Sequence, residues 1–226
     1  MTVSTMGQKS NPVLVVMAAG IGSRYSGLKQ VEPIGPHDEL LLGYSIYDAL
    51  RAGFNKVIFI ISREIEKAFR SRIDQTVDRH CQHVYVYQEL DNLPAGFEIP
   101  PSRQKPWGTA HAVMCSNDVL AAPFGVINAD DCAVSMNMWG FTPRLILELQ
   151  KRFSSFLTDN STNLLQPEFY PPEVVNQLLD EKRATVKVLP TQERWFGVTY
   201  RQDRSEVQKA VLNLIHEGVY PRFLWR

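Results

Sequence analysis

Val13-Leu14-Val15-Val16-Met17-Ala18-Ala19-Gly20-Ile21-Gly22-Ser23-Arg24 is an apolar run that stops at a glycine-containing turn, and Lys29-Gln30 follows five residues later. A short Val-rich run bounded by glycine is typical of a buried strand. The turn lacks bulky side chains, so a ligand can approach the backbone N–H groups, which form an anion-binding concavity. Arg24 and Lys29 supply a planar guanidinium and a point charge for phosphate oxygens. The stretch therefore predicts a strand that ends at a phosphate-binding loop.

Two common nucleotide-binding loops do not fit these residues. After Gly20 and Gly22 the third glycine of the dinucleotide fingerprint is missing, and no Gly-Lys-Ser/Thr follows to make a P-loop. The remaining alternative is a plain strand-to-helix turn, and the two cations Arg24 and Lys29 count against it.

The composition is typical of an ordinary globular domain. The chain has 226 residues, of which 44% are hydrophobic and 21% charged, which predicts one domain with a substantial core. Lys plus Arg and Asp plus Glu are both 24, so no global basic field attracts nucleic acid or an anionic membrane. We expect neither as a partner, and a homo-oligomer is left open.

The cysteines and the first residues indicate the compartment. Cys81, Cys115 and Cys132 are widely spaced and contain no C-x-x-C pair, so neither a disulfide framework nor a zinc site is indicated. No apolar run has membrane-spanning length, and residues 1–11 lack a secretory apolar core. We expect a cytoplasmic protein with a disordered leader at 1–11 and a single domain at 12–226.

Helix and strand patterns alternate along the chain. Helices are expected at 40–50, 64–78, 109–118, 142–152 and 171–182, and strands follow the patterns at 56–61, 84–87, 124–127, 185–189 and 196–200. Ser205 is expected to cap a last helix. Strands that are apolar on both faces and alternate with helices predict an α/β fold, with a doubly wound, mostly parallel sheet, helices on both faces, and ligands at the carboxyl ends of the strands. The Pro-rich segment 89–106 is expected to be a loop over the site or a mobile lid.

Asp130 and Asp131 are adjacent carboxylates at the end of the apolar strand 124–127. Magnesium prefers carboxylate oxygens together with substrate phosphates, and a strand end beside a phosphate loop offers that arrangement. A solvated turn is the alternative for an Asp-Asp pair.

Pro106-Trp107-Gly108-Thr109-Ala110-His111-Ala112 opens a helix after the long loop. A backbone N–H at a helix N-terminus can bind a base or phosphate, and glycine lets the ligand come close. A simple helix start is the alternative. We expect structural roles for Trp107 and His111, and surface positions for His80 and His83.

These motifs resemble those of the sugar-1-phosphate nucleotidyltransferases, or nucleotide-sugar pyrophosphorylases. The pattern A-A-G-x-G-x-R, then K-Q, then Glu32-Pro33-Ile34-Gly35 is similar to the family's signature loop. The resemblance implies that the loop wraps the nucleotide phosphates through Ala19, Gly20 and Gly22, with Arg24 and Lys29 neutralising them. It also implies that Asp130 binds Mg²⁺, with Asp131 in support.

Three further segments extend the resemblance. The pattern P-x-G-T-A is similar to a family segment in which the Gly backbone and a preceding Gln read a pyrimidine base. The resemblance implies that Gly108, Thr109 and Gln88 form this base-binding segment here. It favours UTP or dTTP as the nucleotide. The stretch 136–141 with Asn137, and Glu168 further on, resemble the sugar pocket. A half-buried strand explains 136–141 equally well.

The sequence departs from the family at two places. Only three residues separate Asp131 from Ser135, where the family has several more strands and a helix. Either this is a shortened protein that lacks a central section, or the complete protein contains that section and these 226 residues omit it; family-like residues on both sides favour the second alternative. Trp195-Phe196-Gly197 has glycine where many members carry a second metal-binding aspartate, and Asp203 is out of register.

The resemblance implies transfer of a nucleotidyl group from an NTP to a sugar 1-phosphate, with Mg²⁺ and release of pyrophosphate. One alternative is a cytidylyltransferase for a phosphorylated alcohol such as phosphocholine, for which Trp107, Tyr85 and Tyr87 are the candidate aromatic cage. The other is a nucleotide-binding or regulatory module that has lost its sugar pocket.

Overall fold

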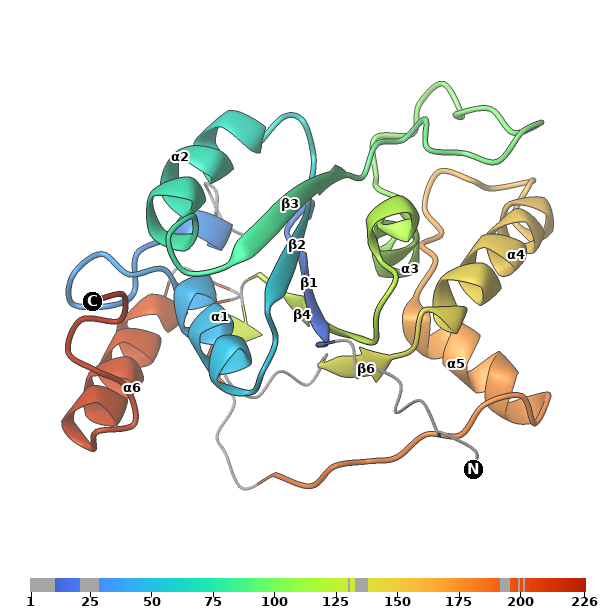
Figure 1. The fold of residues 1–226 in the computed structure, drawn as a ribbon. Coiled ribbons are helices and arrows are strands. Elements are labelled where there is room, and N and C mark those ends of the chain that lie inside the picture. Colours follow the sequence, from blue (N-terminus) through green and yellow to red (C-terminus); the bar gives the residue numbers. More distant parts are fainter. Residues whose placement is uncertain are drawn as a thin grey trace, which may run out of the picture.

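A five-stranded sheet with the order β3-β2-β1-β4-β6 forms the centre of the protein (Figure 1). The structure is a computed structural model that describes residues 11–20, 29–129, 131–132, 138–191, 196–198, 200 and 202–226. Four neighbouring strands are parallel: β1 (Val13–Met17), β2 (Lys56–Ile61), β3 (Gln82–Tyr87) and β4 (Phe124–Asn128). The edge strand β6 (Trp139–Phe141) runs antiparallel to β4. The predicted mostly parallel sheet is confirmed.

Helices cover both faces of this sheet, as expected for a doubly wound fold (Figure 1). One face packs against α1 (Leu41–Arg51) and α2 (Glu66–Val77). The other packs against α3 (Thr109–Met114), α4 (Arg144–Asp159) and α5 (Pro171–Asp180). The last helix, α6 (Asp203–His216), forms a third cluster with residues of α1 and of the C-terminal segment.

The alternation of side chains along β1 explains why the whole strand is apolar. Leu14 and Val16 pack into the cluster with α1 and α2, whereas Val13 and Val15 pack into the cluster with α3, α4 and α5. All four are buried. A strand covered on both faces needs apolar residues at every position, which is the pattern found in the sequence.

The strand order creates a topological switch point between β1 and β4. From β1 the chain passes through α1 to β2 and through α2 to β3 on one side, while β4 pairs with the opposite edge of β1. In open α/β sheets, ligands bind in the crevice outside the carboxyl ends of the two strands that flank such a point. We therefore expect a ligand to bind at the segments that follow β1 and β4.

Smaller elements complete the fold. A second sheet pairs β5 (Asp131–Cys132) with β7 (Phe196–Gly197) in antiparallel fashion. Two short 3₁₀ helices are η1 (Lys29–Val31) and η2 (Asn117–Val119). Within the described residues, no helix is both long and apolar enough to cross a membrane.

In the second half of the chain, one predicted strand was wrong and one predicted helix is longer than expected. The segment 185–189 is not a strand, and Val188 and Leu189 are 82% and 73% exposed. Its apolar residues alternate as in a strand, but alternation forms a strand only where a neighbouring strand is available for pairing. In contrast, α4 continues beyond residue 152, since Phe153 and Leu157 extend its buried stripe.

The predicted helix caps also differ from the structure. Ser205 is the third residue of α6, which begins at Asp203, and the Ser205 hydroxyl donates to the Gln202 carbonyl oxygen. The helix expected to start at residue 142 begins at Arg144, and its N-cap residue, Pro143, makes no side-chain cap bond. The predicted helix 109–118 is divided between α3 and η2.

Candidate functional site

The carboxyl ends of β1 and β4 lie side by side because backbone hydrogen bonds continue beyond both strands. Ala18 N donates to Ile60 O at 2.8 Å, and Ala129 N donates to Met17 O at 3.1 Å. The start of the predicted phosphate loop is thus beside the residue that precedes Asp130. Ala19 is buried and Gly20 is exposed.

Gln30 connects the two ends of the phosphate loop. Its side chain is only 4% exposed, and Nε2 donates to Gly20 O at 2.6 Å. Lys29, directly before it, opens η1. Gly22 and Arg24 lie outside the described residues, as does the side chain of Lys29, so their phosphate-binding roles remain predictions.

The carboxylate pair lies only partly within the described structure. Asp130 is outside it, and Asp131 is placed by its backbone in β5, directly opposite Gly197 of β7. Gly197, where the resemblance implies a second metal-binding aspartate in many members, is therefore the cross-strand neighbour of Asp131. Asp203 accepts a hydrogen bond from Tyr200 N at 2.7 Å, so it has a local role at the start of α6.

Gln88 and Gly108 are brought together, as the resemblance implied. Gln88 follows β3, continues its ladder through a bond from Gln88 N to Ile61 O at 2.9 Å, and is 9% exposed. Its side-chain Nε2 donates to Gly108 O at 2.9 Å. Thr109 is the first residue of α3 and half-buried. The residues of the predicted base-reading segment thus come from two parts of the chain twenty residues apart.

Phe169 is the backbone partner of the Gly108 segment. Phe169 N donates to Trp107 O at 2.7 Å, and Ala110 N donates to Phe169 O at 2.9 Å. Glu168, the residue before it, is ion-paired with Lys105, with 2.6 Å between Nζ and Oε1. Glu168 therefore lies beside the predicted base-reading segment. Asn137, the other predicted sugar-pocket residue, is outside the described residues.

Arg103 is a buried cation that sequence reasoning missed. Its guanidinium donates to the carbonyl oxygens of Leu164, of Pro106 at 2.8 Å and of Pro167 at 3.0 Å. The same group lies 3.7 Å from the centroid of the Trp107 ring. These contacts anchor the end of the 89–106 loop to the segment before Phe169. An arginine inside a Pro-rich loop was the only sequence signal.

His111 and Trp107 are fully buried, as expected for structural residues. Trp107 Nε1 donates to Leu90 O at 2.9 Å. His111 has a polar contact that sequence reasoning missed, because its Nδ1 is 3.1 Å from Gln88 Nε2 and its Nε2 is 2.8 Å from Asn92 O. Through these hydrogen bonds to Leu90 O and Asn92 O, both rings also anchor the start of the long loop.

Acidification is expected to destabilise the protein through His111. Burial lowers the pKa of His111 from 6.5 to about 4, so between these values the unfolded chain binds a proton that the folded chain does not. The free energy of unfolding therefore falls as the pH decreases through this window, by about 3 kcal/mol in total. Urea unfolding at pH 4 to 7 measures it, with His111→Gln as the control. A stability difference between the two proteins that stays constant with pH would contradict the prediction.

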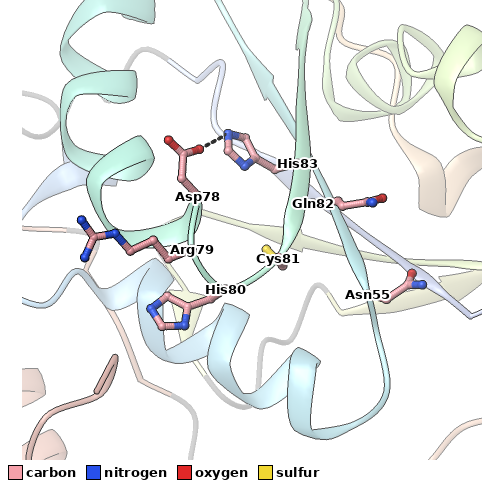
Figure 2. A pocket seen from close by; sticks show the side chains of 7 residues that line it. All are labelled: Asn55, Asp78, Arg79, His80, Cys81, Gln82 and His83. Carbon is pink, nitrogen blue, oxygen red and sulfur yellow. Dashed lines mark ion pairs between the residues drawn. The ribbon is translucent and has the colours of Figure 1, made fainter.

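A separate pocket lies at the amino ends of β2 and β3, at the opposite end of the strands from the candidate site (Figure 2). It is lined by Asn55, Asp78, Arg79, His80, Cys81, Gln82 and His83, which precede or open β2 and β3. His80 is exposed, as expected, but His83 is not at the surface: its side chain is 11% exposed, and Nε2 is 3.5 Å from carboxylate oxygens of both Asp74 and Asp78. This group joins the end of α2 to β3 and is not near the carboxyl ends of the strands.

Comparison with known proteins supports the fold assignment. No family model and no curated protein matches the sequence. Among solved structures, a UDP-glucose pyrophosphorylase in complex with UDP-glucose matches with a TM-score of 0.55 at 13% identity, over 90% of this chain and 99% of that chain. An inositol-1-phosphate CTP transferase from T. maritima matches with a TM-score of 0.62 at 11% identity, over 92% and 98%.

A third match is a protein assigned as a glucose-1-phosphate thymidylyltransferase, from Bacillus anthracis, in complex with sucrose. Its TM-score is 0.62 at 13% identity, over 87% of this chain and 94% of that chain. All three are nucleotidyltransferases by name. The chain thus has the fold of nucleotide-diphospho-sugar transferases, and the predicted fold class is confirmed.

Proposed function

We propose that this protein transfers a nucleotidyl group from an NTP to a sugar 1-phosphate or a related phosphate and releases pyrophosphate. One observation carries the proposal: the phosphate-type loop follows β1 and Asp130 follows the β4 segment, and these strands flank the topological switch point. Likeness of fold to three nucleotidyltransferases supports it.

The chemistry requires positioning and charge neutralisation more than covalent catalysis. An oxygen of the acceptor phosphate attacks the α-phosphorus of the NTP in line, the bond from that phosphorus to its bridging oxygen breaks, and pyrophosphate leaves with the electron pair. Arg24 and Lys29 would bind the phosphate oxygens and stabilise the charge that develops on them. Cations that are in place before the reaction lower the barrier because they need not reorganise during it.

Mg²⁺ is the proposed cofactor, with Asp130 and Asp131 as the residues that would hold it. Carboxylates at a strand end beside a phosphate loop suit a hard cation that also binds substrate phosphates. When bound, the ion would supply positive charge to the phosphate groups. Since Gly197 lies opposite Asp131 in the β5 and β7 pair, this position offers no second carboxylate, and consecutive aspartates would take its place.

UTP or dTTP is the proposed nucleotide. The contact of Gln88 with Gly108 supports a base-reading role for this pair, because it fixes a side-chain amide beside the N-terminus of α3. On the acceptor side, Asn137 and Glu168 are proposed to contact the sugar. The cysteines Cys81 and Cys115 are free thiols, which agrees with the proposed cytoplasmic location.

The structure separates the three aromatic residues that are candidates for a phosphocholine-binding cage. Trp107 packs into the cluster with α3, α4 and α5, whereas Tyr85 and Tyr87 pack against the cluster with α1 and α2, on the other face of the sheet. Arg103 stacks on Trp107, Arg70 on Tyr85 and Arg63 on Tyr87. These three rings therefore cannot surround one quaternary ammonium group, which counts against this alternative.

Pyrophosphate release across a panel of NTPs and acceptor phosphates tests the proposal. We expect Mg²⁺-dependent release with UTP or dTTP and a sugar 1-phosphate, and no release without the acceptor. Lys29→Ala is expected to lower the rate by a factor of about 100 or more, because it removes a charge from the phosphate loop. The matched control is Lys67→Ala, which removes an exposed lysine from α2. Nucleotide binding without release for any acceptor would instead favour the regulatory-module alternative.

A further inference from the structure

Four groups form a hydrogen-bonded chain behind the proposed base-binding segment: Gly108 O, the Gln88 amide, the His111 ring and Asn92 O. Gln88 Nε2 lies 2.9 Å from Gly108 O and 3.1 Å from His111 Nδ1, and His111 Nε2 lies 2.8 Å from Asn92 O. Gln88 is 9% exposed and His111 is fully buried. No part of the proposed mechanism uses His111, although it contacts a residue proposed to read the base.

The partner of Nε2 determines which imidazole nitrogen carries the proton. A backbone carbonyl oxygen only accepts hydrogen bonds, so His111 Nε2 must donate to Asn92 O. Because burial keeps the pKa of His111 near 4, the ring is neutral around pH 7 and Nδ1 is a bare acceptor. The thiol of Cys115, 4.0 Å from Nδ1, keeps its proton because burial raises its pKa to about 12. Nδ1 therefore accepts from the groups around it.

The orientation of the Gln88 amide follows from this tautomer. An acceptor at Nδ1 and an acceptor at Gly108 O together take both hydrogens of Nε2. If the amide rotated by half a turn, Oε1 would face two acceptors and lose both bonds. No described residue donates to Oε1, so this oxygen is the part of the Gln88 side chain that is left for a ligand.

We propose that His111 is a positioning residue, which holds the amide of Gln88 with Oε1 toward the nucleobase and so selects a base that brings a ring N–H. Uracil and thymine have such a group at N3, whereas N3 of cytosine is an acceptor that Oε1 repels. The inference rests on the proposed function, in which Gln88 reads the base. The inference adds His111 as the residue that sets the orientation in which Gln88 reads the base.

Two polar substitutions of His111 separate its two hydrogen bonds. In His111→Asn the side-chain oxygen can take the place of Nδ1 and accept from Gln88, while the bond to Asn92 is lost. In His111→Gln the longer side chain can still donate to Asn92 O, while the acceptor for Gln88 is lost. Both variants remove the buried ring that packs 4.9 Å from Phe153, so they are matched for packing loss.

Calorimetric binding of UTP and of CTP, with Mg²⁺ and without acceptor, tests the inference. We expect His111→Gln to reduce the UTP to CTP affinity ratio about tenfold, the effect of one hydrogen bond, and His111→Asn to keep the ratio of the wild type. Equal loss in both variants, or an unchanged ratio in His111→Gln, would overturn the positioning role. If the wild type still released pyrophosphate in that case, the proposed function would stand; if the wild type bound no NTP, both would fail.

The wild-type protein offers a second measurement that does not depend on how well the variants fold. ¹⁵N NMR of histidine-labelled protein is expected to show His111 as the neutral Nε2–H tautomer throughout pH 6 to 8. A signal from the Nδ1–H tautomer, or from a charged ring, would refute the inference. In either state Nδ1 donates and cannot hold the amide of Gln88 in the proposed orientation.

Discussion

Asp130→Ala is expected to lower the rate of Mg²⁺-dependent pyrophosphate release by a factor of about 1,000, and Asp131→Ala by less. Asp130 follows the Phe124–Asn128 strand at the switch point, where a carboxylate can hold the cation that neutralises the phosphates. Asp131 is the supporting ligand in this proposal, because the resemblance assigns the metal to Asp130. Steady-state rates at saturating Mg²⁺ and NTP measure both effects.

Asp118 provides the matched control for this experiment. It lies in η2, before the amino end of the same strand, and its carboxylate accepts a hydrogen bond from Asn117. Asp118→Ala therefore removes an equal charge from the wrong end of β4 and should leave the rate unchanged. The reverse ranking of Asp130 and Asp131 would mean that the metal assignment is off by one residue, and equal effects at Asp118 would argue against the site itself.

Replacing Gly108 with alanine is expected to cost about 3 kcal/mol or more of stability and to weaken nucleotide binding. The backbone φ angle is +101°, which L side chains rarely adopt, and a Cβ atom would lie 2.4 Å from Phe169 O and 2.6 Å from Phe169 N. Because both of these are backbone atoms, no side-chain rotation relieves the clash. Thermal unfolding should show a decrease of about 10 °C in the midpoint.

Gly96→Ala separates the two contributions to that loss. Gly96 has a similar φ of +90°, but nothing lies within 4 Å of its added Cβ. Only backbone strain therefore lowers the stability of this variant, by roughly 1 kcal/mol. The variant should bind UTP as the wild type does. Equal destabilisation of the two variants would show that Phe169 gives way easily and that the close approach is not important.

The architecture was predictable because local patterns define its elements. Continuous apolar strands and amphipathic helices alternate in the first 130 residues, and this order is compatible with few folds other than a doubly wound sheet. The expected strand 56–61 coincides with β2, and the expected helix 40–50 coincides with α1 to within a residue. The errors lie in the second half, where 185–189 has the alternation of a strand without a strand to pair with.

The candidate site residues were named from contiguous motifs and, for Gln88 and Gly108, through the family resemblance. The phosphate loop and the Asp-Asp pair can be recognised in the sequence because each occupies consecutive residues. Trp107, Tyr85 and Tyr87, the candidate cage of the phosphocholine alternative, pack on different faces of the sheet, and the sequence alone does not tell which face a side chain packs on. His111 and Arg103 were missed as site-supporting residues for a related reason: their partners are other segments of the chain.

The sequence by itself therefore determined the class of fold, the strand that ends at a phosphate-type loop, and the charged residues available for the chemistry. Periodicity and glycine positions act over a few residues, so a linear reading captures them. The tertiary structure alone decided the strand order that places β1 beside β4, the hydrogen-bonded chain from Gln88 to Asn92, and the approach of Phe169 to Gly108. These depend on contacts between residues 19 to more than 100 positions apart, which a reading of local periodicity does not capture.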